Sequence, residues 1–303
     1  MLSPFDRSGL ASLDDLSTPQ WRSLFSRLES IQSEFLDSQP HCADNPWPTD
    51  PLHNCIRVWE YPFVYHHLQS HGGCLSGRPL PRVVDLGSGA TFFPFAVARL
   101  GWRVIAVDAD SRATSSVDRA IGRVSAGGGA VTSLLADARS IALEEESVDC
   151  VYCVSVLEHV PEFEGVIPEI ARILRPNGLF VITFDVDLCG NCELGPAAFA
   201  RLSDALRAFF SPVYPEKVVH PLRVLTTDNR IYPLYPSSFT RDRLIEPLKH
   251  SLHAAYNGLR GRQSPSGRVL ASTYGACLRK HASSKSDSEV GPAEPGWAPQ
   301  WNY

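Results

Sequence analysis

The sequence predicts an α/β protein built around a mostly parallel, doubly wound sheet. Residues 81–108 show the pattern of a strand, a glycine turn, a helix and a second strand, which together form one βαβ unit. Residues 148–154 form a nearly continuous apolar run, which is typical of a parallel strand covered on both faces. Apolar strand patterns continue to alternate with helical patterns as far as residue 185. Such alternation favours one sheet with helices packed on both faces.

The first 78 residues are expected to form an N-terminal helical extension. Residues 1–17 are polar and show no periodic pattern. Thr18 as N-cap and Pro19 at the first helical position then predict a helix that runs to about residue 35. One face of this helix carries apolar residues at intervals of three and four, namely Trp21, Leu24, Phe25, Leu28, Ile31 and Phe35. A proline-rich linker over residues 40–51 precedes a second helix from residue 57 to about Gly72.

The glycine turn between the first two core strands suits a ligand that approaches the backbone. Gly87 and Gly89 carry no Cβ, so the chain can bend tightly and expose N–H groups beside the helix expected at residues 91–100. Gly101 ends that helix, and the next strand ends at Asp108. A carboxylate there can accept hydrogen bonds from both hydroxyls of a ribose. The unit therefore predicts a nucleoside ligand that also carries an anionic or carboxylate group.

These motifs resemble a known family. The run Val84-Asp85-Leu86-Gly87-Ser88-Gly89, followed by Asp108, resembles the first two motifs of the class I S-adenosylmethionine-dependent methyltransferases, although Thr91 stands where that family often has glycine. The "LRPNG" turn at 174–178 resembles the family too. The resemblance covers residues 80–186 by motif and 239–280 by pattern. It implies S-adenosylmethionine as cofactor and a seven-stranded sheet whose last strand, at 268–278, is antiparallel.

The resemblance also implies positions for the cofactor site. A helix at 111–124, the glycines at 127–129 and a third strand at 131–135 lead to Asp137, which matches the family position that meets the adenine amine. A loop carboxylate that caps the following turn is the alternative. The segment from Trp59 to Pro62 is similar to segments of some bacterial methyltransferases, so Glu60 and Tyr61 are expected to close over the cofactor. The full expected set is Asp85, Gly87, Ser88, Gly89, Asp108, Ala109, Asp137, Ala138, Ser155 and Tyr61.

Glu158 and His159 are the catalytic candidates, because they follow the fourth strand at its carboxyl end. The segment from Ser155 to His159 resembles the Glu-x-x-Glu-His segment of metal-dependent O-methyltransferases, in which both glutamates and the histidine hold a divalent ion. Ser155 replaces the first glutamate and is a poor ligand, so no metal is expected. A histidine, whose unperturbed pKa is about 6.5, suits the role of general base near neutral pH, so His159 is expected to take a proton from the acceptor hydroxyl or amine. The alternative is that His159 packs or hydrogen-bonds beneath the cofactor.

The second half of the chain contains an expected insertion. A helix at 163–174 and a fifth strand at 179–185 are followed by residues 188–238, which contain several prolines and one helix at 197–210. This segment is expected to form a substrate cap above the carboxyl ends of the strands. A helix at 239–252 and the last strand return to the core, which therefore comprises 79–187 and 239–280. Residues 281–303, rich in Ser, Pro, Gly and charge, predict a disordered tail.

Composition limits the partners. The 303 residues include 28 Lys and Arg against 33 Asp and Glu, a net charge of −5 with a pI near 6.1, so no basic field attracts nucleic acid. Neither a run of eighteen apolar residues nor a leader sequence is found, which predicts a cytoplasmic protein without membrane contact. Eight scattered cysteines are expected to be reduced thiols. The Cys189 and Cys192 pair has no second pair to complete a zinc site, so both are expected to be cysteines of the cap without a metal or redox role.

The sequence thus favours an S-adenosylmethionine-dependent methyltransferase that acts on an O or N atom of a small metabolite, such as a secondary metabolite or a sugar-like acceptor. A nicotinamide-dependent oxidoreductase is a second interpretation, although a dinucleotide fingerprint would place glycine at 92, where Phe92 stands. A third is a catalytically silent nucleoside-binding protein of the same fold. It would bind the cofactor and transfer no methyl group.

Overall fold

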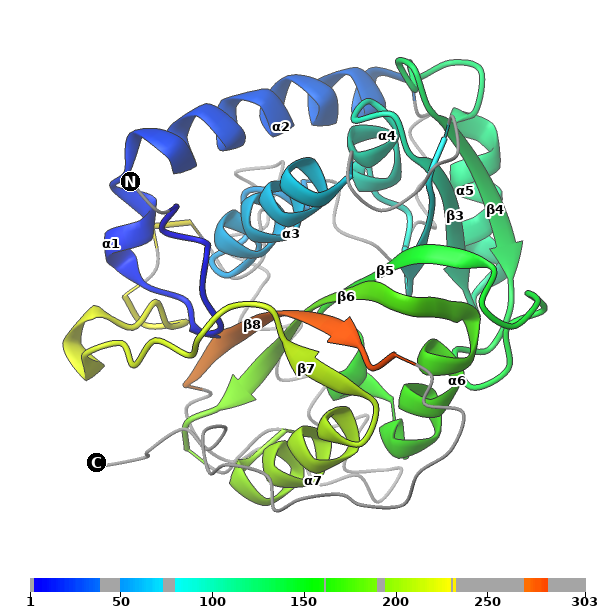
Figure 1. The fold of residues 1–303 in the computed structure, drawn as a ribbon. Coiled ribbons are helices and arrows are strands. Elements are labelled where there is room, and N and C mark those ends of the chain that lie inside the picture. The colour runs from blue at the N-terminus through cyan, green and yellow to red at the C-terminus, as the bar shows by residue number, and fades with distance from the viewer. Residues whose placement is uncertain are drawn as a thin grey trace, which may run out of the picture.

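A single mixed sheet lies between two layers of helices (Figure 1). The computed structural model describes residues 3–38, 50–72, 80–160, 162–189, 194–229, 231–232 and 270–282. Within these residues the strands are β1 (Gly9–Leu10), β2 (Arg82–Leu86), β3 (Arg103–Asp108), β4 (Ala130–Leu135), β5 (Val148–Val154), β6 (Leu174–Asp187), β7 (Phe210–Pro212) and β8 (Ala271–Lys280). Their order in the sheet is β1-β8-β6-β5-β2-β3-β4, and β7 also pairs with β8.

The five central strands are parallel and the last strand is antiparallel. β4, β3, β2, β5 and β6 pair in parallel, with β2 between β3 and β5. β8 pairs with β6 in the antiparallel sense from Leu179 opposite Arg279 to Asp187 opposite Ala271. The predicted doubly wound sheet with an antiparallel last strand is confirmed. Parallel strands place their carboxyl ends along one edge, which is where ligands bind in such sheets.

The sheet has eight strands in the described residues, where seven were expected. Six of them, β2 to β6 and β8, are expected strands; the other two, β1 with two residues and β7 with three, were not expected, and both pair with β8. Residues 1–17 are therefore not simply an extension outside the sheet, and they also contain the short helix α1 (Leu13–Leu16). Strands of two or three residues are too short to show an alternating pattern, so no periodicity predicts them.

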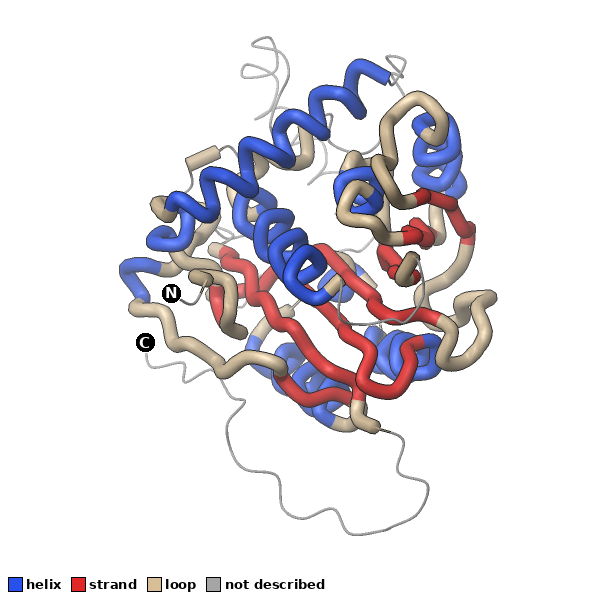
Figure 2. Tube along the Cα trace, turned by 45° about the horizontal axis from the view of Figure 1, so that its top comes forward, coloured by secondary structure: helices blue, strands red, loops and turns tan. Residues whose placement is uncertain are grey.

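Four helices cover one face of the sheet. These are α2 (Pro19–Ser38), α3 (Arg57–His71), α4 (Phe93–Ala98) and α5 (Ser111–Ala120) (Figure 2). All six apolar residues of the predicted stripe on α2 are buried. On α3, Trp59 stacks on Phe63 with ring centroids 4.6 Å apart. A Cβ at Gly275 of β8 would lie 2.7 Å from the Trp59 ring, so only glycine allows α3 to approach β8 this closely.

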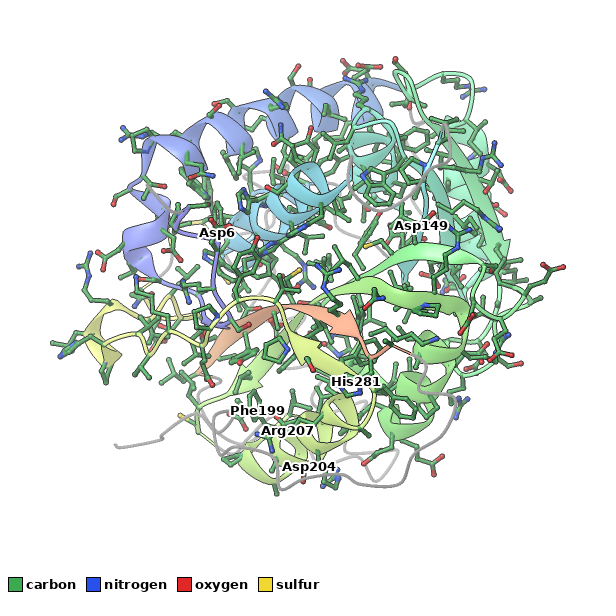
Figure 3. The ribbon with its side chains drawn as sticks, viewed as in Figure 1. Asp6, Asp149, Phe199, Asp204, Arg207 and His281 are labelled. Atoms are coloured by element: carbon green, nitrogen blue, oxygen red, sulfur yellow. The ribbon has the colours of Figure 1, made fainter. Side chains whose placement is uncertain are left out.

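The opposite face is covered by α6 (Val166–Ile173) and α7 (Pro196–Arg207). On α7, Phe199 packs against Phe184 and Tyr274 with ring centroids 5.7 and 5.2 Å away, while Asp204 and Arg207 are more exposed (Figure 3). The helix expected within the substrate cap is thus a layer helix of the core. The apolar side chains on one side of α7 are buried against the sheet. Residues 190–193, 230 and 233–238 of the expected cap lie outside the described residues.

Element boundaries differ from expectation by a few residues. α4 and α5 are shorter than expected, and the 3-10 turn η2 (Phe163–Gly165) precedes α6. β6 begins at Leu174 rather than at residue 179, because Leu174 pairs with Val148 before a register shift near Asn177, whose φ is +63°. The helix expected at 239–252, the linker at 40–49 and the tail from 283 lie outside the described residues. No helix in the described ranges combines the length and apolar character that crossing a membrane requires.

Candidate functional site

Two cavities adjoin at the carboxyl ends of the parallel strands. The larger, about 630 Å³, lies against the ends of β2, β3 and β5 and the segment after β4. The smaller, about 230 Å³, lies between the glycine turn and α3. Gly87 and Ser155 line both cavities. None of the lining residues comes from 188–238, so the described part of the expected cap does not cover either cavity.

All ten residues expected to bind the cofactor line these cavities. Asp108, Ala109, Asp137 and Ala138 line the larger one, Tyr61, Asp85, Ser88 and Gly89 line the smaller one, and Gly87 and Ser155 line both. The residues come from four strand ends and one helix. The tertiary structure therefore gathers the expected set at one edge of the sheet, where their roles remain predictions.

The glycine turn is held by the neighbouring strand. The N–H groups of Gly87 and Ser88 both donate to the Val107 carbonyl of β3, at 2.8 and 3.0 Å, and the N–H of Gly89 donates to the Asp108 carboxylate at 2.8 Å. The expectation that the turn exposes free N–H groups is therefore wrong for these three, because β3 uses them to fix the turn. What the turn offers is space. A Cβ at Gly87, where φ is +71°, would lie 2.4 Å from a Val156 methyl carbon.

Asp108 connects this turn to the larger cavity. Its Oδ2 accepts the hydrogen bond from Gly89, and its Oδ1 accepts one from the Asp110 N–H at 2.8 Å. Each carboxylate oxygen keeps a second lone pair, so both remain able to accept a hydroxyl from a ligand. Because two backbone N–H groups fix the carboxylate, little side-chain entropy remains to be lost when a ligand binds.

Asp137 faces the larger cavity but also holds its own loop. Its carboxylate accepts two hydrogen bonds from the Arg139 guanidinium at 2.9 and 2.7 Å and a third from the Arg139 N–H at 2.8 Å. The guanidinium lowers the pKa of Asp137 to about 2. The alternative interpretation, a loop carboxylate that caps the following turn, is thus realised, and it is compatible with a position beside Ala138 in the cavity wall.

The smaller cavity brings a basic and an acidic side chain together. Arg57 of α3 and Asp85 of β2 both line it, beside the ring of Tyr61. Tyr61 packs on Phe93 with ring centroids 4.7 Å apart. Burial raises the pKa of Asp85 to about 8; Asp108 adds to this rise, and the Tyr152 hydroxyl opposes it. Asp85 is therefore poised to ionise when a cation binds beside it.

A buried carboxylate, Glu60, joins α3 to the carboxyl end of β5. One oxygen of Glu60 pairs with Arg57, and the other accepts hydrogen bonds from Ser155 Oγ at 2.8 Å and Thr273 Oγ1 at 2.9 Å. Glu60 has no exposed surface. Glu60 was expected to close over the cofactor, but it lines neither cavity, and Arg57 and Thr273 had no predicted role. The three-residue spacing of Arg57 and Glu60 on one helix face was the visible signal for half of this network.

The two catalytic candidates separate in the structure. His159, at the end of the 3-10 turn η1 (Leu157–His159), is exposed and lines the larger cavity. Glu158 is buried and lines neither cavity; its Oε1 accepts the Asp185 N–H at 3.1 Å, while its Oε2 has no hydrogen-bond partner within the described part of the chain. Burial raises the pKa of Glu158 to about 7, with Arg57 opposing the shift. Burial also raises the pKa of Asp185, and Glu158 and Glu60 add to the rise.

The residues present suit S-adenosylmethionine. The larger cavity combines the Asp108 carboxylate with apolar walls from Leu86, Ala109 and Ala138, as a nucleoside requires. The smaller cavity offers Arg57 to a carboxylate and Asp85 to an ammonium group, the two charges of an amino-acid end. The Cβ-free space at Gly87 lies in the wall that the two cavities share.

Comparisons with known proteins identify the domain. A family model described as a methyltransferase domain matches residues 84–182. An uncharacterized methyltransferase of Mycobacteroides abscessus is 30% identical over 163 residues, which are 53% of this chain and 58% of the relative. A ubiquinone biosynthesis O-methyltransferase of Xanthomonas oryzae pv. oryzae is 32% identical over 182 residues, 56% of this chain and 64% of the relative. The chain thus spans less than two thirds of the length of either relative.

Solved structures agree on the fold. The crystal structure of the [4+2]-cyclase SpnF superimposes with a TM-score of 0.51 at 16% identity, covering 88% of this chain and 98% of the other. A structure of MccD protein has a TM-score of 0.50 at 12% identity and covers 75% of this chain and 99% of the other. Residues 84–182, which include the glycine turn joined to Asp108, thus match a methyltransferase domain, and the described residues share the fold of these solved structures.

Proposed function

We propose that this protein transfers a methyl group from S-adenosylmethionine to an O or N atom of a small-molecule metabolite. The observation that carries the proposal is the pair of adjoining cavities whose shared wall is Gly87 and Ser155. The larger cavity suits the adenosine portion, with Asp108 as ribose acceptor and Asp137 and Ala138 beside the base. The smaller cavity suits the amino-acid portion, with Arg57 and Asp85 as charged partners. The cofactor's reactive methyl carries the chemistry, and an acceptor would meet it near the shared wall.

The protein's own contribution would be orientation and removal of a proton. Holding two reactants in line can supply about 7 to 11 kcal/mol of the barrier in favourable cases. His159 would take the proton from an acceptor hydroxyl or amine, because it is exposed and lines the larger cavity, and imidazole is the side chain that suits general-base catalysis near neutral pH. Glu158 would act only through its neighbours, since it lies behind the cavity wall and bonds the Asp185 backbone. It is therefore a positioning residue in this proposal.

The choice of an O or N acceptor rests on the chemistry of the site and on the relatives. Those named ubiquinone biosynthesis O-methyltransferases methylate oxygen, as their name states. A secondary metabolite or a sugar-like molecule remains the expected acceptor. One of the solved structures with this fold is a [4+2]-cyclase, so the fold alone does not specify the reaction. Methyl transfer is therefore tested separately from cofactor binding.

Calorimetry with S-adenosylmethionine and its demethylated product tests the cofactor. We expect the Asp108→Ala variant to lose affinity by about ten-fold to a hundred-fold, because a charged hydrogen bond contributes roughly 1.5 to 3 kcal/mol. Asp110→Asn is the matched control, since Asp110 caps α5 without lining a cavity. Equal affinity in Asp108→Ala and the wild type would overturn the cofactor assignment.

A methyl-transfer screen with labelled cofactor then tests turnover on panels of hydroxyl and amine acceptors. Incorporation that disappears in Asp108→Ala supports the proposal. Tight cofactor binding without transfer to any acceptor class would instead favour the catalytically silent nucleoside-binding protein. Hydride transfer with a nicotinamide cofactor would favour the oxidoreductase.

A further inference from the structure

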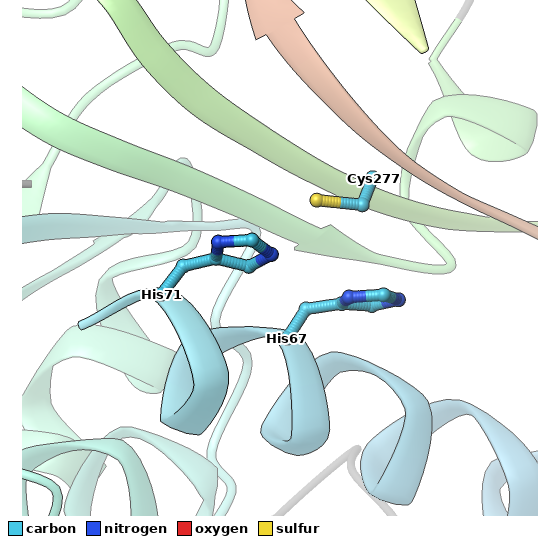
Figure 4. Close-up of side chains that lie close together, drawn as sticks. All are labelled: His67, His71 and Cys277. Carbon is cyan, nitrogen blue, oxygen red and sulfur yellow. The ribbon is translucent and has the colours of Figure 1, made fainter. Parts of the chain in front are cut away.

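Two histidines of α3 and one cysteine of β8 converge away from both cavities. His67 and His71 are four residues apart and so lie on one face of α3. This face is turned toward Cys277 (Figure 4). One ligand atom from each side chain lies within 4.8 Å of the others. This is the group of three potential metal ligands that the described residues bring together. It is built from segments about 200 residues apart in the sequence.

The environment of His67 also indicates a ligand. This side chain is completely buried, and among the residues that the structure describes neither ring nitrogen has a hydrogen-bond partner of ordinary geometry. Its nearest ring neighbours are Phe63, at 4.5 Å between centroids, and Tyr214, at 5.3 Å. A buried polar group without a partner costs about 1 to 3 kcal/mol. A bound metal ion would remove that cost, because it accepts an imidazole lone pair.

The protonation states suit metal binding. Burial lowers the pKa of His67 well below its ordinary value, His66 and His71 add to this, and the Phe5 backbone opposes it, so the imidazole is neutral. Burial also lowers the pKa of His71. Neutral imidazole is the form that binds metals. Arg279 lowers the pKa of His71 and Asp6 raises it, so these two charges oppose each other at this position.

Cys277 supplies the thiol. It is a free, buried cysteine, and burial raises its pKa to about 12 while Arg279 opposes the shift. Without a metal it stays protonated. On binding, the metal–sulfur bond forms as the S–H bond breaks, and the proton leaves to solvent. The partly exposed His71 offers a route, and its Nε2 lies 3.1 Å from the Tyr214 hydroxyl, an outer partner of the kind that orients metal-bound histidines.

We propose that His67, His71 and Cys277 bind a zinc ion that joins α3 to β8. Two imidazoles and one thiolate form a donor set that zinc favours, with a water molecule in the fourth tetrahedral position. Zinc–ligand distances of about 2.0 to 2.3 Å place the ligand atoms roughly 3.5 Å apart, so small side-chain rotations close the site. The site would fix the helix whose first turns carry Arg57 and Tyr61 to the smaller cavity. It does not depend on the reaction proposed above.

Metal content tests the site directly. We expect protein prepared without a histidine tag, then dialysed with zinc and passed through a desalting column, to retain close to one zinc per chain by elemental analysis. Cys277→Ala and His71→Gln should each lower zinc affinity by about 100-fold or more, since loss of an outer partner alone can cost 10-fold to 100-fold. Cys153→Ala removes a buried thiol on the opposite sheet face and should leave zinc content unchanged.

Cobalt spectroscopy is a second test, and its main result comes from the wild-type protein alone. Cobalt added to the wild-type apoprotein should produce a thiolate-to-metal charge-transfer band in the near ultraviolet, which Cys277→Ala lacks and Cys153→Ala keeps. Zinc should also raise the melting temperature of the wild type and of Cys153→Ala, and not that of Cys277→Ala. A wild type that retains no zinc and gives no cobalt–thiolate band would overturn the proposal. Full zinc retention in both Cys277→Ala and His71→Gln would overturn it too, by placing the ion elsewhere.

Discussion

Glu60 accepts a hydrogen bond from the hydroxyl of Ser155, with Oε1 and Oγ 2.8 Å apart and 95 residues between them. Ser155 has a φ of +47°, which is uncommon for a residue other than glycine. It also stands in the wall that both cavities share. The buried glutamate of α3 thus holds a strained residue in place at the centre of the site.

Replacing Glu60 should weaken the fold more than most substitutions do. In Glu60→Ala, Arg57 loses its ion-pair partner while Ser155 and Thr273 lose their acceptor. We expect a loss of about 3 to 5 kcal/mol in the free energy of unfolding, measured by urea titration. Glu60→Gln keeps an acceptor oxygen for both hydroxyls and should cost clearly less. Equal losses in the two variants would show that the hydrogen bonds contribute little.

The space beside Gly87 should be essential for cofactor binding. In Gly87→Ala the new Cβ would meet Val156 at 2.4 Å and the backbone would be held at a positive φ, so the turn must shift. We expect cofactor affinity measured by calorimetry to fall by at least about ten-fold, and Gly87→Val to abolish binding.

Gly101→Ala is the matched control for this substitution. Gly101 has a φ of +89°, yet a Cβ there would meet nothing within 4 Å. It therefore reproduces the backbone strain without the clash. If both alanine variants bound the cofactor equally well, the shared wall at Gly87 would not be in contact with it.

The buried carboxyl of Asp85 should make stability depend on pH. Its pKa is raised from 3.8 to about 8, so the unfolded chain releases this proton well below the pH at which the folded chain does. The folded state therefore binds more protons between these values, and its stability falls as pH rises from about 4 to about 8. Asp85→Asn stays neutral and should flatten this fall. Urea titrations of both proteins between about pH 5 and pH 9 measure it, and identical slopes would contradict the raised pKa.

His159 should affect turnover and not cofactor binding. We expect His159→Ala to lower the rate of methyl transfer by roughly 10²-fold or more, which is within the usual range for a general base, while calorimetry shows nearly unchanged cofactor affinity. His281→Ala is the control, because His281 is an exposed histidine that lines neither cavity. Loss of cofactor binding in His159→Ala would instead make His159 part of the pocket wall.

Local patterns in the sequence determined much of the fold. The stripe on α2, the apolar run of β5 and the glycine turn before Asp108 each lie within a short stretch, where the spacing of residues follows the geometry of a helix, a strand or a turn. The ten expected cofactor residues line two adjoining cavities for the same reason, because parallel strands bring their carboxyl ends to one edge. The resemblance to a known family supplied the antiparallel direction of β8.

Only the tertiary structure decided which distant residues meet. β1 and β7 are too short to carry a pattern, and the helix expected in the cap buries its apolar stripe on the sheet as α7. The four-residue spacing of His67 and His71 is visible in the sequence, but Cys277 faces them only because β8 lies beside α3. Likewise Glu60 reaches Ser155 only across the packed layers, and burial then raises the pKa of Asp85 and Glu158. Such contacts depend on strand order and desolvation, which no local periodicity specifies.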